Sequence, residues 1–249
     1  MRMLLFANRN TKEVLRDPIN LFFGLGFPLV LLVLLSIINT AIPPEANNPM
    51  FEIENLAPGL SMFGSAFMAL FTGMLLAKDR TSSFLARLFT SPMTALDFLL
   101  GYTLPMLIMA IIQGAITLLA SCVVGLPLSI NIIPAIFMTA VVSLFFIGFG
   151  LLAGSLMSDG AVGGICGALL TNVAGWLSGI FIPIDLIGGL FKKIAHLLPF
   201  YHGVEAIRNV LFGNYSEITL HVMIVLGYAV VIFVFAIIAF RSKASGDTV

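Results

Sequence analysis

The sequence predicts an all-α integral membrane protein with six transmembrane helices, and three observations support this fold class. Its 249 residues are 59% hydrophobic and 10% charged, and the mean hydropathy is +1.10. All Lys, Arg, Asp and Glu lie outside five long stretches. The longest of these, between Asp97 and Asp159, holds 61 residues, whereas about 20 apolar residues suffice for one helical crossing. It must fold back at Gly125-Leu126-Pro127, which brings the number of crossings to six.

The expected spans follow the uncharged stretches in chain order, within a single transmembrane domain that covers residues 1–249. Lipid offers no partner to unpaired backbone groups, and the apolar runs are continuous and not alternating. Helices are therefore expected, and not barrel strands. The six spans are residues 19–42, 56–77, 98–124, 132–157, 161–183 and 218–240.

The distribution of basic residues predicts the orientation. With the N-terminus in the cytoplasm, nine of the twelve Lys and Arg residues lie on the cytoplasmic side, and only Lys192, Lys193 and Arg208 lie on the other. Both termini are therefore expected in the cytoplasm, and the protein in the cell membrane.

The N-terminal residues 1–18 have two interpretations. Met3, Leu4 and Phe6 alternate with basic positions such as Arg9 and Lys12, which is typical of an amphipathic helix lying on the inner membrane surface. The alternative is a juxtamembrane basic patch that only sets the topology.

A polar loop, residues 78–97, is expected to carry a short cytoplasmic helix between the second and third spans. An apolar face on such a helix needs a surface to cover it. That surface is either the membrane with the ends of neighbouring spans, or a groove on a soluble partner. The apolar stripe is Phe84, Leu85, Leu88 and Phe89, accompanied by Asp79, Arg80 and Arg87.

On the outer side, residues 185–198 are expected to form one amphipathic helix that ends at Pro199, followed by a second helix over 201–212. The second should carry a Glu205–Arg208 ion pair, and both are too short and too charged to span, so they should be interfacial or re-entrant. His196 and His202 flank the proline. A metal site there is weaker than the alternative of histidines on polar faces, so no metal site is predicted.

Small residues four positions apart mark close helix approaches in the fourth and fifth spans. Gly150 and Gly154 in the fourth are expected to pack inside the subunit. In the fifth span the packing residues are Gly160, Gly163, Gly164 and Gly167.

The composition argues against several function classes. Equal numbers of acidic and basic residues give no sign of a nucleic-acid partner. No His, Asp or Glu lies mid-span, so no catalytic residues are predicted, and a charge-relaying secondary carrier has only edge residues such as Asp97 and Asp159 to use. A passive channel is an alternative that the sequence does not exclude. The sequence has no G-x-x-x-x-G-K-[ST] phosphate loop, so ATP hydrolysis, if it drives this protein, belongs to another chain.

The order of these segments resembles the permease subunits of ABC-2 type transporters over essentially the whole chain. The basic start carries Arg16-Asp17-Pro18, residues 78–92 are similar to the family's coupling-helix stretch, and residues 198–208 look like its outer helix region. One departure is Ala86, where the family has a glutamate.

The resemblance implies a half-transporter: two permease copies with two separately encoded ATPase subunits, which hold ATP and Mg while this chain binds no cofactor. A homodimer is expected, with a heterodimer as the alternative, and the fifth span should face the first span of the other copy. The substrate path is expected at Ser36, Asn39, Asn172 and Trp176. Because that path carries no fixed charge, an amphiphilic or hydrophobic substrate such as a drug, antibiotic, lipid or lipopeptide is expected. A polysaccharide or glycolipid is the alternative, which the single Trp and four Tyr disfavour.

Overall fold

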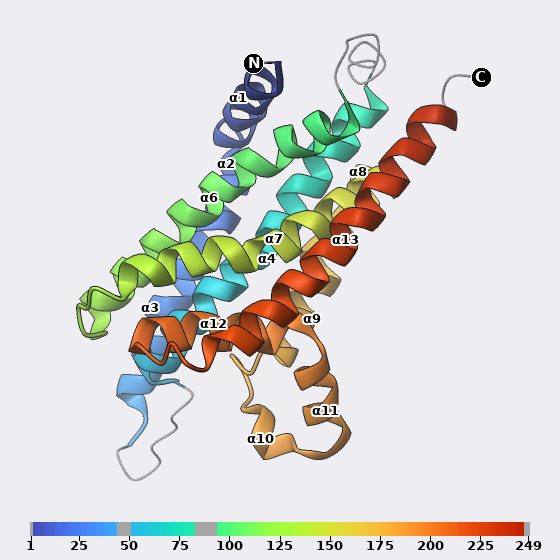
Figure 1. The fold of residues 1–249 in the computed structure, drawn as a ribbon. Helices are drawn as coiled ribbons and strands as arrows, with labels where there is room; N and C mark the ends of the chain where they lie inside the picture. The colour runs from blue at the N-terminus through green and yellow to red at the C-terminus, as the bar shows by residue number, and fades with distance from the viewer. Residues whose placement is uncertain (1, 44–50, 83–93, 247–249) are drawn as a thin grey trace.

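The computed structural model describes residues 2–43, 51–82 and 94–246, and within these ranges every regular element is a helix (Figure 1). The elements are α1 (Arg2–Leu15), α2 (Pro18–Leu21), η1 (Phe22–Gly26), α3 (Phe27–Ala41), α4 (Ile53–Thr81), α6 (Ala95–Val124), α7 (Ile132–Leu156), α8 (Asp159–Val162), η4 (Gly163–Leu170), α9 (Thr171–Leu177), α10 (Ile184–Ile187), α11 (Gly189–Leu197), α12 (Pro199–Phe212) and α13 (Ile218–Gly246).

Six helices are long and apolar enough to cross a membrane, which confirms the predicted fold class. The first combines α2, η1 and α3, and the fifth combines α8, η4 and α9. The fifth helix ends at Leu177, six residues before its predicted end at Pro183. Gly179 has a φ of 83°, a left-handed conformation that a right-handed helix cannot continue through, so residues 178–183 leave the helix.

The second span, α4, is the central helix of the bundle: 89% of its most apolar window is buried. It packs against α3, α6, α7 and η4. Glycines permit the closest of these approaches, because a Cβ on Gly150 would lie 2.2 Å from the Ala69 carbonyl oxygen and one on Gly154 would lie 2.5 Å from that of Gly73. The backbones of α4 and α7 are therefore in contact, and the expectation that the fourth-span glycines pack within the subunit is confirmed.

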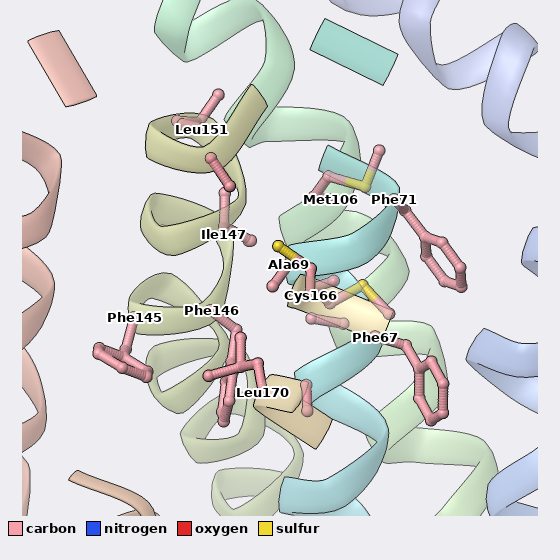
Figure 2. Packing of buried hydrophobic residues seen from close by; sticks show 14 of the residues in the cluster. Phe67, Ala69, Phe71, Met106, Phe145, Phe146, Ile147, Leu151, Cys166 and Leu170 are labelled. Carbon is pink, nitrogen blue, oxygen red and sulfur yellow. The ribbon is translucent and has the colours of Figure 1, made fainter. Parts of the chain in front are cut away.

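Aromatic side chains fill the remaining space around α4 and α7. Figure 2 shows Phe67 and Phe71 pointing from one side of α4, with Cys166 of the fifth span near Ala69 and Leu170 near Phe146. The Phe67 ring lies 5.8 Å from that of Phe23 in the first span. Lipid provides no hydrophobic driving force between helices, so packing of this kind is what holds such a bundle together.

The two ends of the bundle differ (Figure 1). The start of α1 and the end of α13 lie at one end, and α10 and α11 lie at the other. We label these the inner and the outer end after the predicted orientation, which the fold itself does not test. The predicted single helix over 185–198 is wrong, because Gly188 and Gly189 have φ values of 64° and 55° and divide it into α10 and α11. Pro199 begins α12 and does not merely end its predecessor, since proline suits the first turn of a helix.

Candidate functional site

One face of the fifth span is open in the single chain. An ideal Cβ built on Gly160, Gly163 or Gly164 meets no atom within 4 Å, whereas one on Gly167 lies 3.3 Å from the Leu70 side chain. Three of the four predicted packing glycines therefore have open space where a side chain would lie, within the described part of one copy, and Gly167 packs against α4. We define the open face as the exposed residues at four-residue spacing along this span: Gly160, Gly164, Ala168, Asn172 and Trp176.

The open face ends in the two polar residues that were predicted to meet substrate. Asn172 and Trp176 are both exposed and lie one turn apart on α9, with Trp176 52% exposed. The Asn172 amide donates a hydrogen bond to the Ala168 carbonyl oxygen at 2.7 Å. Its remaining donor and its acceptor, like the indole N–H, are available to a ligand or to another chain.

The first span has a comparable exposed surface. Only 17% of its most apolar window is buried. A groove of about 430 Å³ runs along it, lined by Leu29, Val30, Val33, Leu34 and Ile37. Ser36 donates to the Leu32 carbonyl oxygen at 2.7 Å. The two predicted halves of the path lie on separate helices, α3 and α9, which both pack against α4. Within the described part of one copy no hydrogen bond joins Ser36 or Asn39 to Asn172 or Trp176.

Both of these spans contain a π-helical segment, a feature that the sequence reasoning missed. Phe22–Gly26 and Gly163–Leu170 are π-helices, a rare conformation that often accompanies functional sites. In the first, the Phe27 N–H bonds the Phe22 carbonyl oxygen. Pro28 follows, and having no N–H it cannot bond the carbonyl four residues earlier. That proline was the available signal.

At the inner end a buried carboxylate joins three helices. Asp79 near the end of α4 is 3% exposed. It accepts hydrogen bonds from Arg9 of α1 at 2.5 and 2.8 Å and from the Tyr102 hydroxyl of α6 at 2.8 Å. We call Arg9, Asp79 and Tyr102 the inner anchor. Burial lowers the pKa of Arg9, but the hydrogen bond and charge of Asp79 outweigh it, so that this pKa is raised overall.

The neighbouring Arg80 caps the C-terminal end of α7. Its guanidinium donates to the carbonyl oxygens of Met157, at 2.7 Å, and Ser155. Ser155 lies in the last turn of α7 and Met157 is its C-cap, a helix end where a cation is favourable. Asp79 and Arg80 thus both make contacts inside the chain. The other predicted coupling residues lie outside the described residues: Phe84, Leu85, Arg87, Leu88 and Phe89.

The N-terminal segment is a helix docked on the protein. Phe6, Asn10 and Val14 are buried on the side of α1 that packs against α6. The Phe6 ring lies 5.0 Å from that of Tyr102, and the Asn10 amide donates to the Gly101 carbonyl oxygen at 3.0 Å. Residues 2–15 are therefore helical and packed on the protein; their place on the membrane surface stays a prediction.

The expectation that the outer histidines lie on polar faces is wrong for one of them. His202 is 4% exposed. Its Nε2 lies 2.8 Å from the His196 carbonyl oxygen and its Nδ1 lies 2.7 Å from Nδ1 of His221. Because a carbonyl only accepts, Nε2 carries a proton, and the contact between the two Nδ1 atoms holds one more. Burial lowers the pKa of His202.

One predicted ion pair at the outer end is confirmed. Glu205 and Arg208 form the expected ion pair. Across residues 2–43, 51–82 and 94–246, no group of three or more His, Cys, Asp or Glu side chains is placed to hold a metal ion.

Comparison with known proteins agrees with the arrangement of the spans. The model of the ABC-2 type transporter family matches residues 2–212, from α1 to the end of α12. No curated protein matches the chain. The match covers most of the chain. Together with the six candidate spans, it identifies a multi-pass membrane protein. The chain belongs to the ABC-2 type transporter family and is a transmembrane permease component of an ABC transporter, not itself catalytic.

Proposed function

We propose that this permease exports an amphiphilic or hydrophobic molecule, driven by a separate ATPase subunit, and that two copies of the chain enclose the path. The observation that carries the proposal is the open face of the fifth span. If this face met lipid, no helix would make the close backbone contact that its glycines permit, and the Asn172 amide would lie in hydrocarbon.

A second copy related by twofold symmetry is the occupant that fits this face best. Twofold dimers are the commonest closed assemblies of soluble chains, and in membranes small residues allow helix backbones to approach closely. The first span offers the complementary surface, a shallow groove of branched aliphatic side chains such as Val30, Val33 and Ile37. We propose that the first span of one copy faces the fifth span of the other. A heterodimer with a similar permease would use the same surfaces.

The chemistry of these surfaces favours an amphiphile. The open face carries one amide and one indole, and the first span adds the Ser36 hydroxyl and the Asn39 amide to an aliphatic groove. No Lys, Arg, Asp or Glu lies between Gly160 and Trp176, so a strongly anionic polymer would find no counter-charge. The second candidate is a polysaccharide or glycolipid, exported by a permease of the same family. The exposed Trp176 favours it, because an indole stacks on sugar rings.

Coupling to the ATPase is proposed through the segment that follows α4. The last turn of α4 is tied to α1 by Asp79 and to α7 by Arg80. A displacement of the following residues by a partner would therefore reach three helices at once. We propose that the stripe Phe84, Leu85, Leu88 and Phe89, with Arg87, contacts the ATPase, and that Asp79 and Arg80 transmit the movement. Both termini would then lie in the cytoplasm.

The test is reconstitution of the permease with its ATPase in lipid vesicles and a panel of substrates. We expect hydrophobic compounds or lipids to stimulate ATP hydrolysis, and Trp176→Ala to reduce that stimulation. Val230→Ala, on an equally exposed position of α13, is the matched control. Stimulation by lipid-linked glycans with none by hydrophobic compounds would overturn the substrate class. Equal responses of the two variants would remove the open face from the path.

A further inference from the structure

A basic cavity lies at the inner end of the molecule, apart from the open face. Its volume is about 700 Å³, and residues of α1, of the turn before α2 and of the last turns of α4 line it. The lining includes four cations, Arg9, Lys12, Arg16 and Lys78, and two carboxylates, Glu13 and Asp17. Cations from two helices distant in sequence are thus gathered around one space.

The carboxylates of the cavity are engaged, whereas three of its cations have no side-chain partner in the part of the chain that the structure describes. Glu13 pairs with Arg9 at 2.6 Å. Asp17 accepts hydrogen bonds from the backbone N–H groups of Ile19 and Asn20 at 3.0 and 3.3 Å, as the N-cap of α2. The side chains of Lys12, Arg16 and Lys78 have no hydrogen bond or ion pair with any described residue. All three are exposed.

An apolar edge adjoins these cations. Leu5 lines the cavity and is 65% exposed. Leu4 and Leu15 of the same helix are at least half exposed, and the first span begins at Pro18, directly after the cavity. The opposite side of α1 is already buried against α6. A free leucine edge beside cations, at the start of a membrane span, is the pattern of a surface that meets lipid headgroups and the first carbons of their chains.

We propose that this cavity binds the phosphate headgroup of an anionic phospholipid in the adjoining leaflet. Lys12, Arg16 and Lys78 hold the phosphate oxygens, and the Leu4–Leu5 edge contacts the glycerol and acyl chains. Basic residues near a membrane surface attract anionic lipid, and Arg and Lys are the side chains that bind phosphate. An acidic segment of a partner protein would match the charges but would leave the exposed leucines uncovered. The bound lipid would bridge α1 and α4 beside the inner anchor.

The test is native mass spectrometry of the purified full-length chain, titrated with phosphatidylglycerol or with phosphatidylcholine. We expect one phosphatidylglycerol to bind at a concentration at least tenfold lower than phosphatidylcholine. The double substitution Lys12→Gln/Lys78→Gln should abolish that preference. Lys192→Gln/Lys193→Gln, which removes the same charge from α11 at the other end, is the matched control and should keep it.

Other outcomes would overturn the proposal. Equal affinity for the two lipids, or an unchanged preference in Lys12→Gln/Lys78→Gln, would show that the cavity does not select an anionic headgroup. Displacement of the bound lipid by an equal concentration of glycerol phosphate would show that a soluble phosphate suffices. Loss of ATPase co-purification in the double variant, with lipid binding intact, would assign the cavity to the partner protein. Thermal unfolding of each variant shows that loss of binding is not loss of fold.

Discussion

The glycines of the fourth and fifth spans share a four-residue spacing but lie in different surroundings. Gly150 and Gly154 bring α7 into backbone contact with α4, whereas Gly160 and Gly164 have no atom within 4 Å of a built Cβ. The same spacing therefore serves a contact inside the chain in one span and an unoccupied face in the other. A small-xxx-small pattern locates close approach, and the structure is needed to say whether the partner belongs to the same chain.

The last span provides the reference for a surface that meets lipid. In α13 only 22% of the most apolar window is buried, less than the 33% of the fifth span. Its exposed side chains are bulky and apolar, among them Val230, Val231 and Phe235. Those of the fifth span are small or polar over most of its length. Low burial alone does not distinguish the two surfaces; the chemistry of the exposed residues does.

The largest expected effect comes from filling the space at Gly150. Gly150→Ala places a Cβ 2.2 Å from the Ala69 carbonyl oxygen, a backbone atom that cannot rotate away. We expect it to lower the free energy of unfolding by about 3 kcal/mol, the upper end of overpacking costs. Gly227→Ala, where nothing lies within 4 Å, should have little effect. Equal thermal unfolding of the two variants in detergent would show that α4 and α7 are not in contact.

Breaking the inner anchor should come next, and it should act on the single copy alone. Arg9→Gln leaves the Asp79 carboxylate buried, with the Tyr102 hydroxyl as its remaining side-chain partner among the described residues. Removing one member of a fully buried pair costs about 3–5 kcal/mol, and the Arg9 side chain is 34% exposed, so we expect about 2 kcal/mol. The measurement is thermal unfolding beside analytical ultracentrifugation. A change in dimerisation without a change in stability would contradict the assignment of these contacts to one chain.

A bulky side chain on the open face should act on the dimer alone. Gly164→Leu has room within one copy, so the fold should persist, but the residue would separate the two copies. Overpacking of about 1–3 kcal/mol corresponds to a dimer at least about fivefold weaker. Gly227→Leu on the last span has equal room and should dimerise normally. Sedimentation of both variants in mild detergent measures the difference, and equal weakening would place the two spans in the same environment.

The smallest expected effect is on the pH dependence of stability, through the contact between His202 of α12 and His221 of the last span. Burial holds the pKa of His202 below its ordinary value of 6.5, so the unfolded chain binds the proton more readily than the folded one. Stability is therefore retained above about pH 6.5 and lost as the pH falls through and below it. His202→Gln should flatten this dependence in thermal unfolding between pH 5 and 7.5. A variant that keeps the full dependence would assign it to other groups.

Charge placement made the six spans predictable, because a buried charge in lipid is costly enough to exclude it from every span. The fourth-span glycines and the Glu205–Arg208 pair followed from helical spacing. The break at Gly188 and Gly189 did not, because glycine adopts left-handed and right-handed conformations about equally readily, so two glycines inside an apolar stripe do not by themselves say which they take.

The inner anchor and the buried histidine could not be predicted for a different reason. Arg9 and Asp79 are 70 residues apart, and each alone looks like a solvated charge near a helix end. His202 and His221 lie on separate helices and meet only through the packing of α12 on α13. Contacts between distant polar residues require the arrangement of helices, which single-sequence patterns do not contain. Of the two π-helical segments, the first is marked in the sequence by Pro28, and we find no comparable signal at the second.

The most direct test of the contact between copies is disulfide crosslinking at mid-depth of the first and fifth spans. In a background with Cys122→Ala and Cys166→Ala, the chain carrying Val30→Cys and Ala168→Cys should form a covalent dimer in native membranes on mild oxidation. Both positions are exposed in one copy. The chain carrying Val30→Cys and Val230→Cys should stay monomeric on reducing-agent-free gels. Equal crosslinking of the two, or crosslinking only in the second, would contradict a dimer built on the open face.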